Sequence, residues 1–511
     1  MANEPDPTPE DHIAQPNGSG CRKIHFEDGC AEDPGGEPDC RGPNVRRFAK
    51  RSAAGEENDR VSGRVSARQS EINDAMDGKT DVQLKKLQRC RNVITWLFLF
   101  VAGMLTGLTA LLVIHVVEKV VHWRTERAAH AVEAGNVGQA MVEFVLISTS
   151  LIMFGCTILV LKCPAAAGSG IVEVKAYLNG NRAVESAFSM NALLCRVVGI
   201  ITSVGGGLTV GMEGPFVRVG TALSYQTRNA LNHITPMYHN DSKFDLLVIS
   251  SGAAAGLAAA FGVPIGGMLF AAEAASYWSR ELMLTSLFIA IVADFIKTYA
   301  YRRIMHGEWN TPIMDTASIN VFRTGEQSYY SSELAAFAFL GVLGGLLGSY
   351  FSIAQVVMDK YRKKHYGSRK KIFSLLECLV VALVTSLSLF LTAFGGQCHA
   401  MNGEVAINGT ASNSSATALI GTGRQMGLDL HLMRWNCGED EYNDVASLLH
   451  TTHEGTLSIL FTQGDSSEFV DLITPGSLWL VASVYFTLSV FSYGLKTSTG
   501  IYMPGMIVGA A

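Results

Sequence analysis

Charge and cysteine are both scarce in this sequence. Asp, Glu, Lys and Arg make up only 17% of its 511 residues, whereas 48% of the residues are hydrophobic. Soluble domains carry about 25% charged residues, so this balance argues against an ordinary soluble multidomain protein. Ten cysteines are too few and too scattered for a disulfide scaffold, and a net charge of −5 argues against nucleic-acid binding. The composition predicts an all-α polytopic membrane protein.

Motifs of the common enzymes are also missing. The chain contains no dinucleotide fingerprint, no Walker motif and no nucleophile elbow, so we expect no enzyme. Cys21, Cys30 and Cys40 are spaced widely and irregularly, without the paired steps of a structural zinc site, and we interpret them as free thiols. We therefore expect no metal site.

The first 90 residues mix charge, Gly, Pro and Ser with few large apolar side chains. Such a segment buries too little apolar surface to offset its chain entropy, so residues 1–90 are predicted to be a disordered tail. No signal peptide opens the chain. Lys85, Lys86, Arg89 and Arg91 precede the first apolar run, and the positive-inside rule then places the N-terminus on the cytoplasmic side.

Long apolar runs predict the membrane spans, because a hydrocarbon core of about 30 Å takes about 20 residues of helix. Between 168 and 300 the apolar stretches are shorter and are broken by glycine and proline. Broken helices at membrane depth are tolerated where they line a cavity or are buried in protein, so this region is the best candidate for an ion site. The polybasic link 359–371 should be cytoplasmic. The longer predicted spans are 93–117, 141–162, 333–358, 372–394 and 477–495.

The loop 396–475 differs in charge from that link. It contains two arginines and no lysine, and it carries glycosylation sequons at Asn408 and Asn413. We expect it to face the lumen or the exterior. Cys398 and Cys437 lie in the same loop, where an oxidising space would permit a disulfide, but sequence alone leaves their distance open.

Three glycine-bearing motifs lie within the apolar part of the chain: GSGIVE at 168–173, GMEGP at 211–215 and GIYMP at 500–504. A helix N-terminus leaves N–H groups unpaired and carries about half a positive charge, so a helix that begins inside a membrane offers an anion site. Glycine lets the ion approach the backbone, and proline suits the first turn. One such motif alone would indicate helix packing, but three together favour an anion site that holds its ion without a full positive charge.

Glu213 stands inside the second motif. An acid at membrane depth is costly and is by default a candidate functional residue. Its own flanking N–H groups are candidate donors, so its carboxylate can occupy the site of the anion and protonation would release it. This competition is the minimum machinery that couples anion movement to protons. The alternative is a loop-exposed Glu213 that merely caps a helix.

At these residues the sequence resembles the CLC family of chloride channels and chloride/proton exchangers. The family signatures GSGIPE, GKEGP and GxFxP correspond in order to the three motifs, and the resemblance extends over about 93–511. It implies a CLC-type fold of inverted repeats with many tilted and broken helices, which places one transport domain at 91–511. It also implies a homodimer with one pathway per subunit. The polybasic link and the sequons most resemble the intracellular branch, which implies an endosomal, lysosomal or vacuolar membrane.

The resemblance also implies roles for individual residues. Ser169 is similar to the serine whose hydroxyl contacts chloride at the central site, where relatives with proline prefer nitrate. Glu213 is similar to the gating glutamate that accepts the proton. The remaining anion donors that it implies are the backbone N–H groups of Gly214, Ile501, Tyr502 and Met503.

Several residues depart from the family pattern. Val172 stands where the first signature has proline, and Met212 replaces the lysine before the gating glutamate, a charge for which Arg218 is expected to substitute in part. Exchangers carry a pair of glutamates after the sequence GGxLFxx, whereas this chain has only Glu273, which corresponds either to a structural glutamate or to the internal proton relay. The chain stops at Ala511, before the last helices and the nucleotide-binding CBS pair of longer relatives, which predicts a C-terminally truncated product.

The leading hypothesis is a chloride/proton antiporter gated by a glutamate. A passive voltage-gated chloride channel of the same fold is the second, and a non-transporting subunit that dimerises with longer relatives is the third. We expect no cofactor besides the transported chloride and protons. The expected partners are membrane lipid and a second copy of the chain, with any accessory subunit unknown and no nucleic acid.

Overall fold

The computed structural model describes residues 81–234, 242–275, 279–305, 331, 333–365, 370–400, 420–425, 428–438, 441–461 and 473–511. The chain divides into two units, Met1–Leu84 and Lys85–Ala511, and apart from the first residues of α2 everything below belongs to the second. The glycosylation candidates Asn408 and Asn413 lie outside the described residues.

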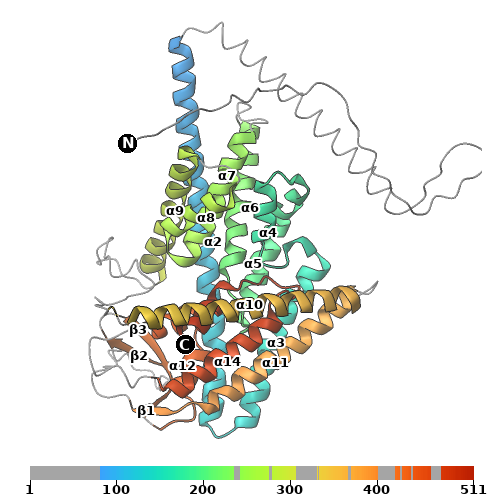
Figure 1. The fold of residues 1–511 in the computed structure, drawn as a ribbon, viewed down its shortest axis with the longest axis vertical. Coiled ribbons are helices and arrows are strands. Elements are labelled where there is room, and N and C mark those ends of the chain that lie inside the picture. The colour runs from blue at the N-terminus through green and yellow to red at the C-terminus, as the bar shows by residue number, and fades with distance from the viewer. Residues whose placement is uncertain are drawn as a thin grey trace, which may run out of the picture. The chain divides into compact units, whose positions relative to one another are not determined.

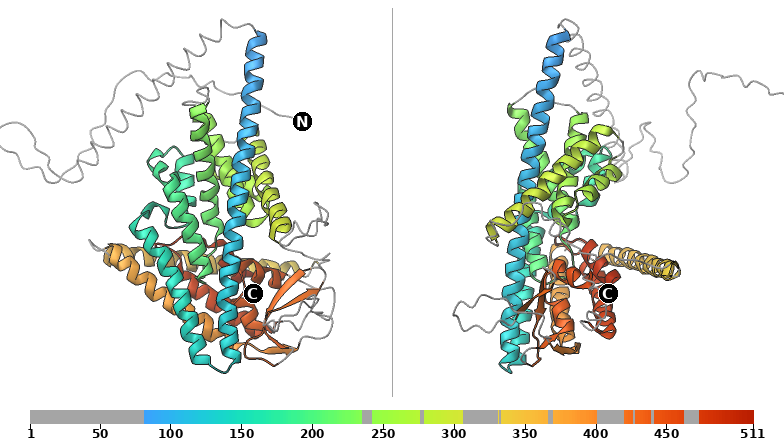
Figure 2. Two further views of the ribbon diagram at one scale, coloured as in Figure 1. Left: turned by 180° about the vertical axis from the view of Figure 1, so that it is seen from behind. Right: turned by 90° about the vertical axis from the view of Figure 1, so that its left-hand side faces the viewer.

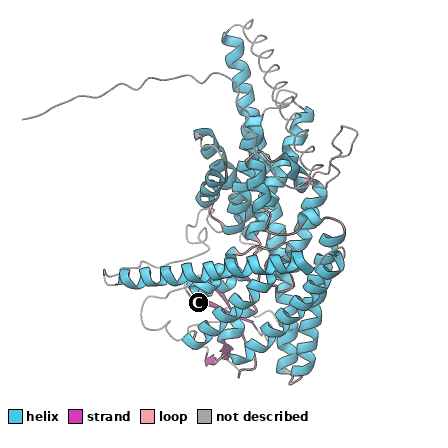
Figure 3. Ribbon diagram, turned by 45° about the vertical axis from the view of Figure 1, so that its right-hand side comes forward, coloured by secondary structure: helices cyan, strands magenta, loops and turns pink. Residues whose placement is uncertain are grey.

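Helices make up nearly all of the described structure (Figure 3). The first group, up to the polar stretch after residue 305, consists of α2 (Asp81–Glu133), α3 (Val137–Leu161), α4 (Ile171–Leu178), α5 (Met190–Gly205), α6 (Glu213–Ile234), α7 (Ser242–Phe261), α8 (Pro264–Ala274) and α9 (Arg280–Ala300) (Figure 1). The second group consists of α10 (Glu333–His365), α11 (Lys370–Thr392), α12 (Asp444–Leu449), α13 (His453–Phe461), α14 (Pro475–Ser492) and α15 (Tyr502–Ala510).

Seven of the described helices are long and apolar enough to cross a membrane. Five of them correspond to the long predicted spans, although two of these predictions, 141–162 and 477–495, run one and three residues past the helix ends. The other two are the helices Lys243–Phe261 and Arg280–Arg303. Large apolar side chains lie exposed on them, for example Leu108, Phe154 and Leu340, as expected of surfaces that face lipid. The chain is therefore a multi-pass membrane protein.

Two features differ from the sequence-based expectation. Helix α2 begins at Asp81, so residues 81–90 are helical although the sequence assigned them to the disordered tail. Good helix formers such as Leu84, Lys85 and Lys86 continue the helical period of the span. The expected all-α structure also contains two short antiparallel strand pairs, β1 (Cys398–Ala400) with β4 (Glu441–Asn443) and β2 (Ile420–Gln425) with β3 (Leu428–Met433).

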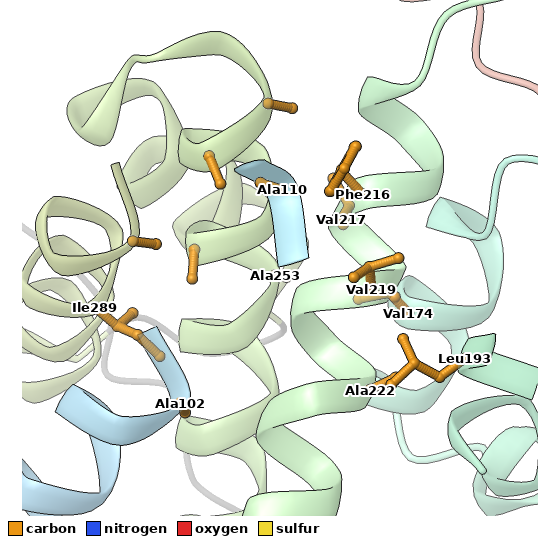
Figure 4. Close-up of a cluster of buried hydrophobic side chains, with 14 of the residues drawn as sticks. Ala102, Ala110, Val174, Leu193, Phe216, Val217, Val219, Ala222, Ala253 and Ile289 are labelled. Carbon is orange, nitrogen blue, oxygen red and sulfur yellow. The ribbon is translucent and has the colours of Figure 1, made fainter. Parts of the chain in front are cut away.

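Helices α2, α4, α5, α6, α7, α8 and α9 contribute to the largest buried cluster. Figure 4 shows part of it, with Phe216, Val217, Val219 and Ala222 on α6 and Ile289 on α9. Helices α6 and α7 approach closely because small residues meet at their contact. A Cβ on Gly220 would lie 2.6 Å from the backbone nitrogen of Gly256 and 2.8 Å from its Cα. Such small-residue contacts fix helices in the absence of a hydrophobic driving force. They set the position of α6, whose first residue is Glu213.

The strand pairs belong to the segment that sequence analysis placed outside the membrane. Cys398 and Cys437 form a disulfide there, with their Cα atoms 5.8 Å apart. The disulfide that the sequence left open is therefore present in the structure. Cys398 belongs to β1 and Cys437 lies shortly before β4, among the strands drawn in orange in Figure 2.

A buried carboxylate ties this segment to α14. Burial raises the pKa of Asp444, but hydrogen bonds from Ser477 and from the N–H groups of Gln397, Val445 and Thr474 lower it more, so the pKa lies below its usual value. The N–H groups of Gln397 and Val445 donate to one carboxylate oxygen at 2.8 and 2.7 Å. The ionised form of Asp444 is thus the one that the fold stabilises.

Candidate functional site

The three glycine-bearing motifs meet in the structure. Gly211 and Gly500 exchange two backbone hydrogen bonds, with N···O distances of 2.7 and 2.9 Å. The N–H of Gly168 donates to the carbonyl of Thr497 at 2.8 Å, which joins the first motif to the segment just before the third. Segments from both groups of helices therefore form one site.

Each motif then opens a helix. Gly170 is the N-cap of α4, α6 begins at Glu213, and Ile501 is the N-cap of α15. Gly168 and Gly170 have φ angles of 81° and 85°, a left-handed conformation that glycine adopts without strain. The helix N-termini thus lie where the motifs predict them, and their first N–H groups have no partners within their own helices.

Glycine is required where the motifs touch. A Cβ on Gly214 would lie 2.8 Å from the hydroxyl oxygen of Ser169. A Cβ on Gly500 would lie 3.2 Å from the backbone nitrogen of Gly214. Ser169, Gly214 and the third motif therefore meet at one place. The other predicted donors, the N–H groups of Ile501, Tyr502 and Met503, belong to the N-cap and first turn of α15, which follow Gly500 directly.

Glu213 is fully buried at the start of α6. Its carboxylate folds back over Gly211, where a Cβ would overlap the carboxylate oxygen Oε2 and would lie 3.2 Å from Cβ of Met503. The N–H groups of Met212, Glu213 and Met503 lie close to the carboxylate. Even so, neither of its oxygens has a hydrogen-bond partner among the described residues. The carboxylate of Glu213 therefore lies at the junction of the second and third motifs and can still accept hydrogen bonds. Its burial excludes the alternative of a loop-exposed residue that only caps a helix.

Two buried arginines support the first motif. The guanidinium of Arg196 in α5 donates to the carbonyls of Gly168 and Ser169 at 2.9 and 3.2 Å. That of Arg218 in α6 lies 3.4 Å from the carboxylate of Glu173. Both arginines are 1% exposed, and Glu173 is the one carboxylate in an ion pair with either of them in the described part of the chain. Two guanidinium groups against one carboxylate leave a net positive charge next to Ser169, which favours an anion there.

Sequence analysis missed Arg196. The available signal was its place as a lone charged residue in the apolar stretch 191–210, because an ionisable side chain inside a membrane segment marks a functional or structural site. Glycine and proline patterns identified the motifs themselves but carry no information on which distant side chain supports them.

The departures from the signatures have simple structural consequences. Val172 is 75% exposed in the first turn of α4, and the helix forms without the proline. Met212 is buried in the large apolar cluster, so the position before Glu213 contributes packing rather than charge. The positive charge near the first motif comes instead from Arg196 and Arg218.

Glu273 lies near the end of α8. Its carboxylate pairs with the ammonium group of Lys175 in α4 at 3.1 Å, and its side chain is 72% exposed. This pairing joins the end of α8 to α4, the helix that the first motif opens. The role of Glu273 as the internal proton relay stays a prediction.

Comparison with known proteins identifies the family. The family model described as "Voltage gated chloride channel" matches residues 149–511. The chain belongs to the CLC family. Its CLC relatives include chloride channel protein C of Dictyostelium discoideum, which is 30% identical over 425 residues, 81% of this chain and 53% of the relative. Another relative is H(+)/Cl(−) exchange transporter 7 of Homo sapiens, which is 28% identical over 434 residues, 81% of this chain and 49% of the relative. The chain thus spans about half the length of the curated relatives it matches.

Solved CLC structures share the fold. A slow cyanobacterial Cl−/H+ antiporter superposes with a TM-score of 0.56 at 19% identity, covering 81% of this chain and 78% of the other. A eukaryotic CLC transporter superposes with a TM-score of 0.52 at 20% identity, covering 80% of this chain and 57% of the other. At these identities the similarity establishes the fold, and the expectation of a CLC-type fold is confirmed.

Proposed function

We propose that this chain moves chloride across an intracellular membrane in exchange for protons, with Glu213 as the gate. The observation that carries the proposal is the buried carboxylate of Glu213 at the junction of two helix-opening motifs, with neither oxygen hydrogen-bonded among the described residues. A carboxylate in such a place competes with an anion for the same N–H groups. One relative that carries the name of an H+/Cl− exchanger supports the same reading.

The anion half of the mechanism uses helix N-termini. Chloride would lie between the hydroxyl of Ser169, the N–H of Gly214 and the first N–H groups of α15. Arg196 adds positive potential from behind the first motif, where its Nη1 donates to the carbonyls of Gly168 and Ser169. The ion would contact only the partial charges of N–H and O–H groups, while the full charge of Arg196 lies behind them. This arrangement allows chloride binding that is favourable but still reversible.

The proton half uses Glu213. When its carboxylate is ionised it takes the position of the anion, and when it binds a proton it loses the charge that holds it there. Chloride then binds to the N–H groups that the carboxylate has left. The proton is released when Glu213 ionises again. Each cycle therefore moves anion and proton in opposite directions.

Reconstituted vesicles test this proposal. Under a pH gradient the reversal potential of the wild type should shift with pH. A reversal potential that is independent of pH would refute the proposed exchange. The variant Glu213→Ala should lose proton movement and keep chloride movement. The matched control is Asp359→Ala, which removes an exposed carboxylate paired with Lys363 on α10. It should leave both fluxes unchanged.

A passive chloride channel is the second candidate. It is favoured by Glu273, the one acid at the position of the exchangers' glutamate pair, which is exposed and neutralised by Lys175. A channel would show chloride flux with no dependence of its reversal potential on pH.

Further features of the proposal come from the family. We propose a homodimer in an endosomal, lysosomal or vacuolar membrane with the N-terminus in the cytoplasm and glycosylation at Asn408 and Asn413. Treatment with an endoglycosidase should lower the apparent mass of the wild-type protein. The same treatment should leave the apparent mass of the double variant Asn408→Gln/Asn413→Gln unchanged.

A further inference from the structure

A cavity of about 740 Å³ lies between α2, the turn after α9 and the helices α12 and α13. Its titratable lining includes Glu118, His122 and Glu126 from α2, Tyr301 from the turn, and His450 and Glu454 from the segment of α12 and α13. Lys119 and His115 add to it from α2. Such a density of ionisable side chains is unusual in a protein with 17% charged residues.

Two arguments place this cavity on the membrane side opposite the basic start of α2. Helix α2 crosses the membrane from its basic start, and about 20 residues of helix, at 1.5 Å each, bring it to the far surface near Glu118. The other wall comes from residues 450–458, which belong to the loop predicted to face the lumen or exterior. The cavity therefore opens toward that compartment.

Glu454 connects the cavity to the gate. It stands in the first turn of α13 and lines the cavity. It interacts electrostatically with Glu118 on one side and with Glu213 on the other. Helix α13 also packs against α15, because Leu457 shares a buried cluster with Met503, the residue beside the carboxylate of Glu213. One short helix thus touches both the cavity and the third motif.

The charges around Glu454 come from every neighbouring element. Glu118 acts from α2, Glu213 from α6 and Lys297 from α9. Tyr301 donates to the carboxylate of Glu118 at 3.0 Å. On its own segment the neighbouring ionisable groups are His450 and His453. Lys297, the ammonium group that acts on Glu454, is also paired with Asp294 at 3.3 Å. Glu118 and Glu213 each interact with Glu454, and ionisation of one acid in such a series raises the cost of ionising the next, so protons are shared along it.

Unpartnered buried atoms lie at both ends of this series. Both ring nitrogens of His450, which is 1% exposed and lines the cavity, lack a hydrogen-bond partner among the described residues. At the inner end both carboxylate oxygens of Glu213 lack one too. Buried polar atoms are normally satisfied by protein or by ordered water, so these atoms indicate ordered water at both ends of the series.

We propose that Glu454 passes protons between the outer cavity and Glu213. Inward, a hydronium ion in the cavity gives its proton to the Glu454 carboxylate and becomes water. The O–H bond on Glu454 then breaks as its proton passes to a bridging water. That water gives a proton to the carboxylate of Glu213, where a new O–H bond forms, and Glu454 is ionised again. The outward direction reverses both steps. This inference rests on the proposed exchange and names the outer route of its proton.

The test measures proton and chloride fluxes together in vesicles that hold the full chain. Glu454→Gln keeps the volume and removes the titrating oxygen, so proton flux should fall at least about tenfold while chloride flux continues. The proton flux of this variant should also depend less on the pH of the compartment into which the cavity opens. Glu454→Asp restores a carboxylate and should restore proton flux. Asp359→Asn replaces an exposed carboxylate of α10 that does not line the cavity, and as the matched control it should behave as the wild type does.

The outcomes separate this inference from the proposed function. A wild type that couples protons, with Glu454→Gln coupling them at the same rate, overturns the role of Glu454 and leaves the exchanger reading intact. Equal loss of both fluxes in Glu454→Gln and in Glu454→Asp assigns the residue to structure alone and also overturns it. A wild type without proton flux refutes the exchanger and this route together.

Discussion

Replacing Gly220 by alanine tests how tightly α6 is held. The new Cβ would lie 2.6 Å from the backbone nitrogen and 2.8 Å from the Cα of Gly256, and it would also meet the carbonyl oxygen of Gly252. All three atoms belong to the backbone of α7, so no side chain can turn away. Carbon atoms pack at about 3.5–4.0 Å, which means that α6 and α7 must move apart by about 1 Å.

The expected cost follows from that movement. Overpacking a close contact destabilises a protein by about 1–3 kcal/mol. Because Glu213 lies two turns before Gly220 on the same helix, the displacement also moves the gate against the third motif. We expect Gly220→Ala to lower the thermal unfolding temperature of the detergent-solubilised protein and to reduce chloride flux in vesicles.

Gly344→Ala on α10 is the matched control. A Cβ at Gly344 meets nothing within 4 Å, so the same substitution should leave both stability and flux unchanged. If Gly220→Ala kept the unfolding temperature and the flux of the wild type, the α6–α7 contact could not be as close as described.

Two further predictions concern single side chains. Asp444→Asn should destabilise the protein by about 1–3 kcal/mol, since the N–H groups that hold the carboxylate lose a charged acceptor. Because the pKa of Asp444 is lowered in the fold, its stabilisation is present above about pH 4 and is lost as the pH falls further, and unfolding curves of wild type and variant should converge there. Ser169→Pro should shift the anion preference from chloride toward nitrate. Equal reversal potentials before and after the substitution would remove Ser169 from the site.

The sequence predicts much of this site because its signals are local. Glycine and proline spacing located all three helix starts, and the apolar runs located the long spans. Glu213 was identifiable because an isolated acid in an apolar stretch is rare. The start of α2 was missed by ten residues, since charge and polarity near a membrane span do not distinguish a solvated helix from a coil.

Contacts between distant parts of the chain could not be predicted. The hydrogen bonds of Arg196 with the first motif depend on how α5 packs, and the position of Glu454 between cavity and gate depends on α13 meeting α15. Local patterns place a residue on a helix but do not say which other helix it faces. The strand pairs were missed because each strand has only three to six residues, which leaves too short a pattern to recognise.

The pairing of the second motif with the third also bears on how the protein is made. Beside that pairing, Ser203 donates to the carbonyl of Ser498 across 295 positions of sequence. A ribosome adding about 5–20 residues per second needs roughly 15–60 s to cover that distance. During this interval α6 is already synthesised, but the third motif is not. Gly211 therefore lacks its backbone partner, and the carboxylate of Glu213 lacks the neighbouring Met503. The acid therefore remains without the segment that buries it until late in synthesis, and slowing translation after α11 should prolong that interval.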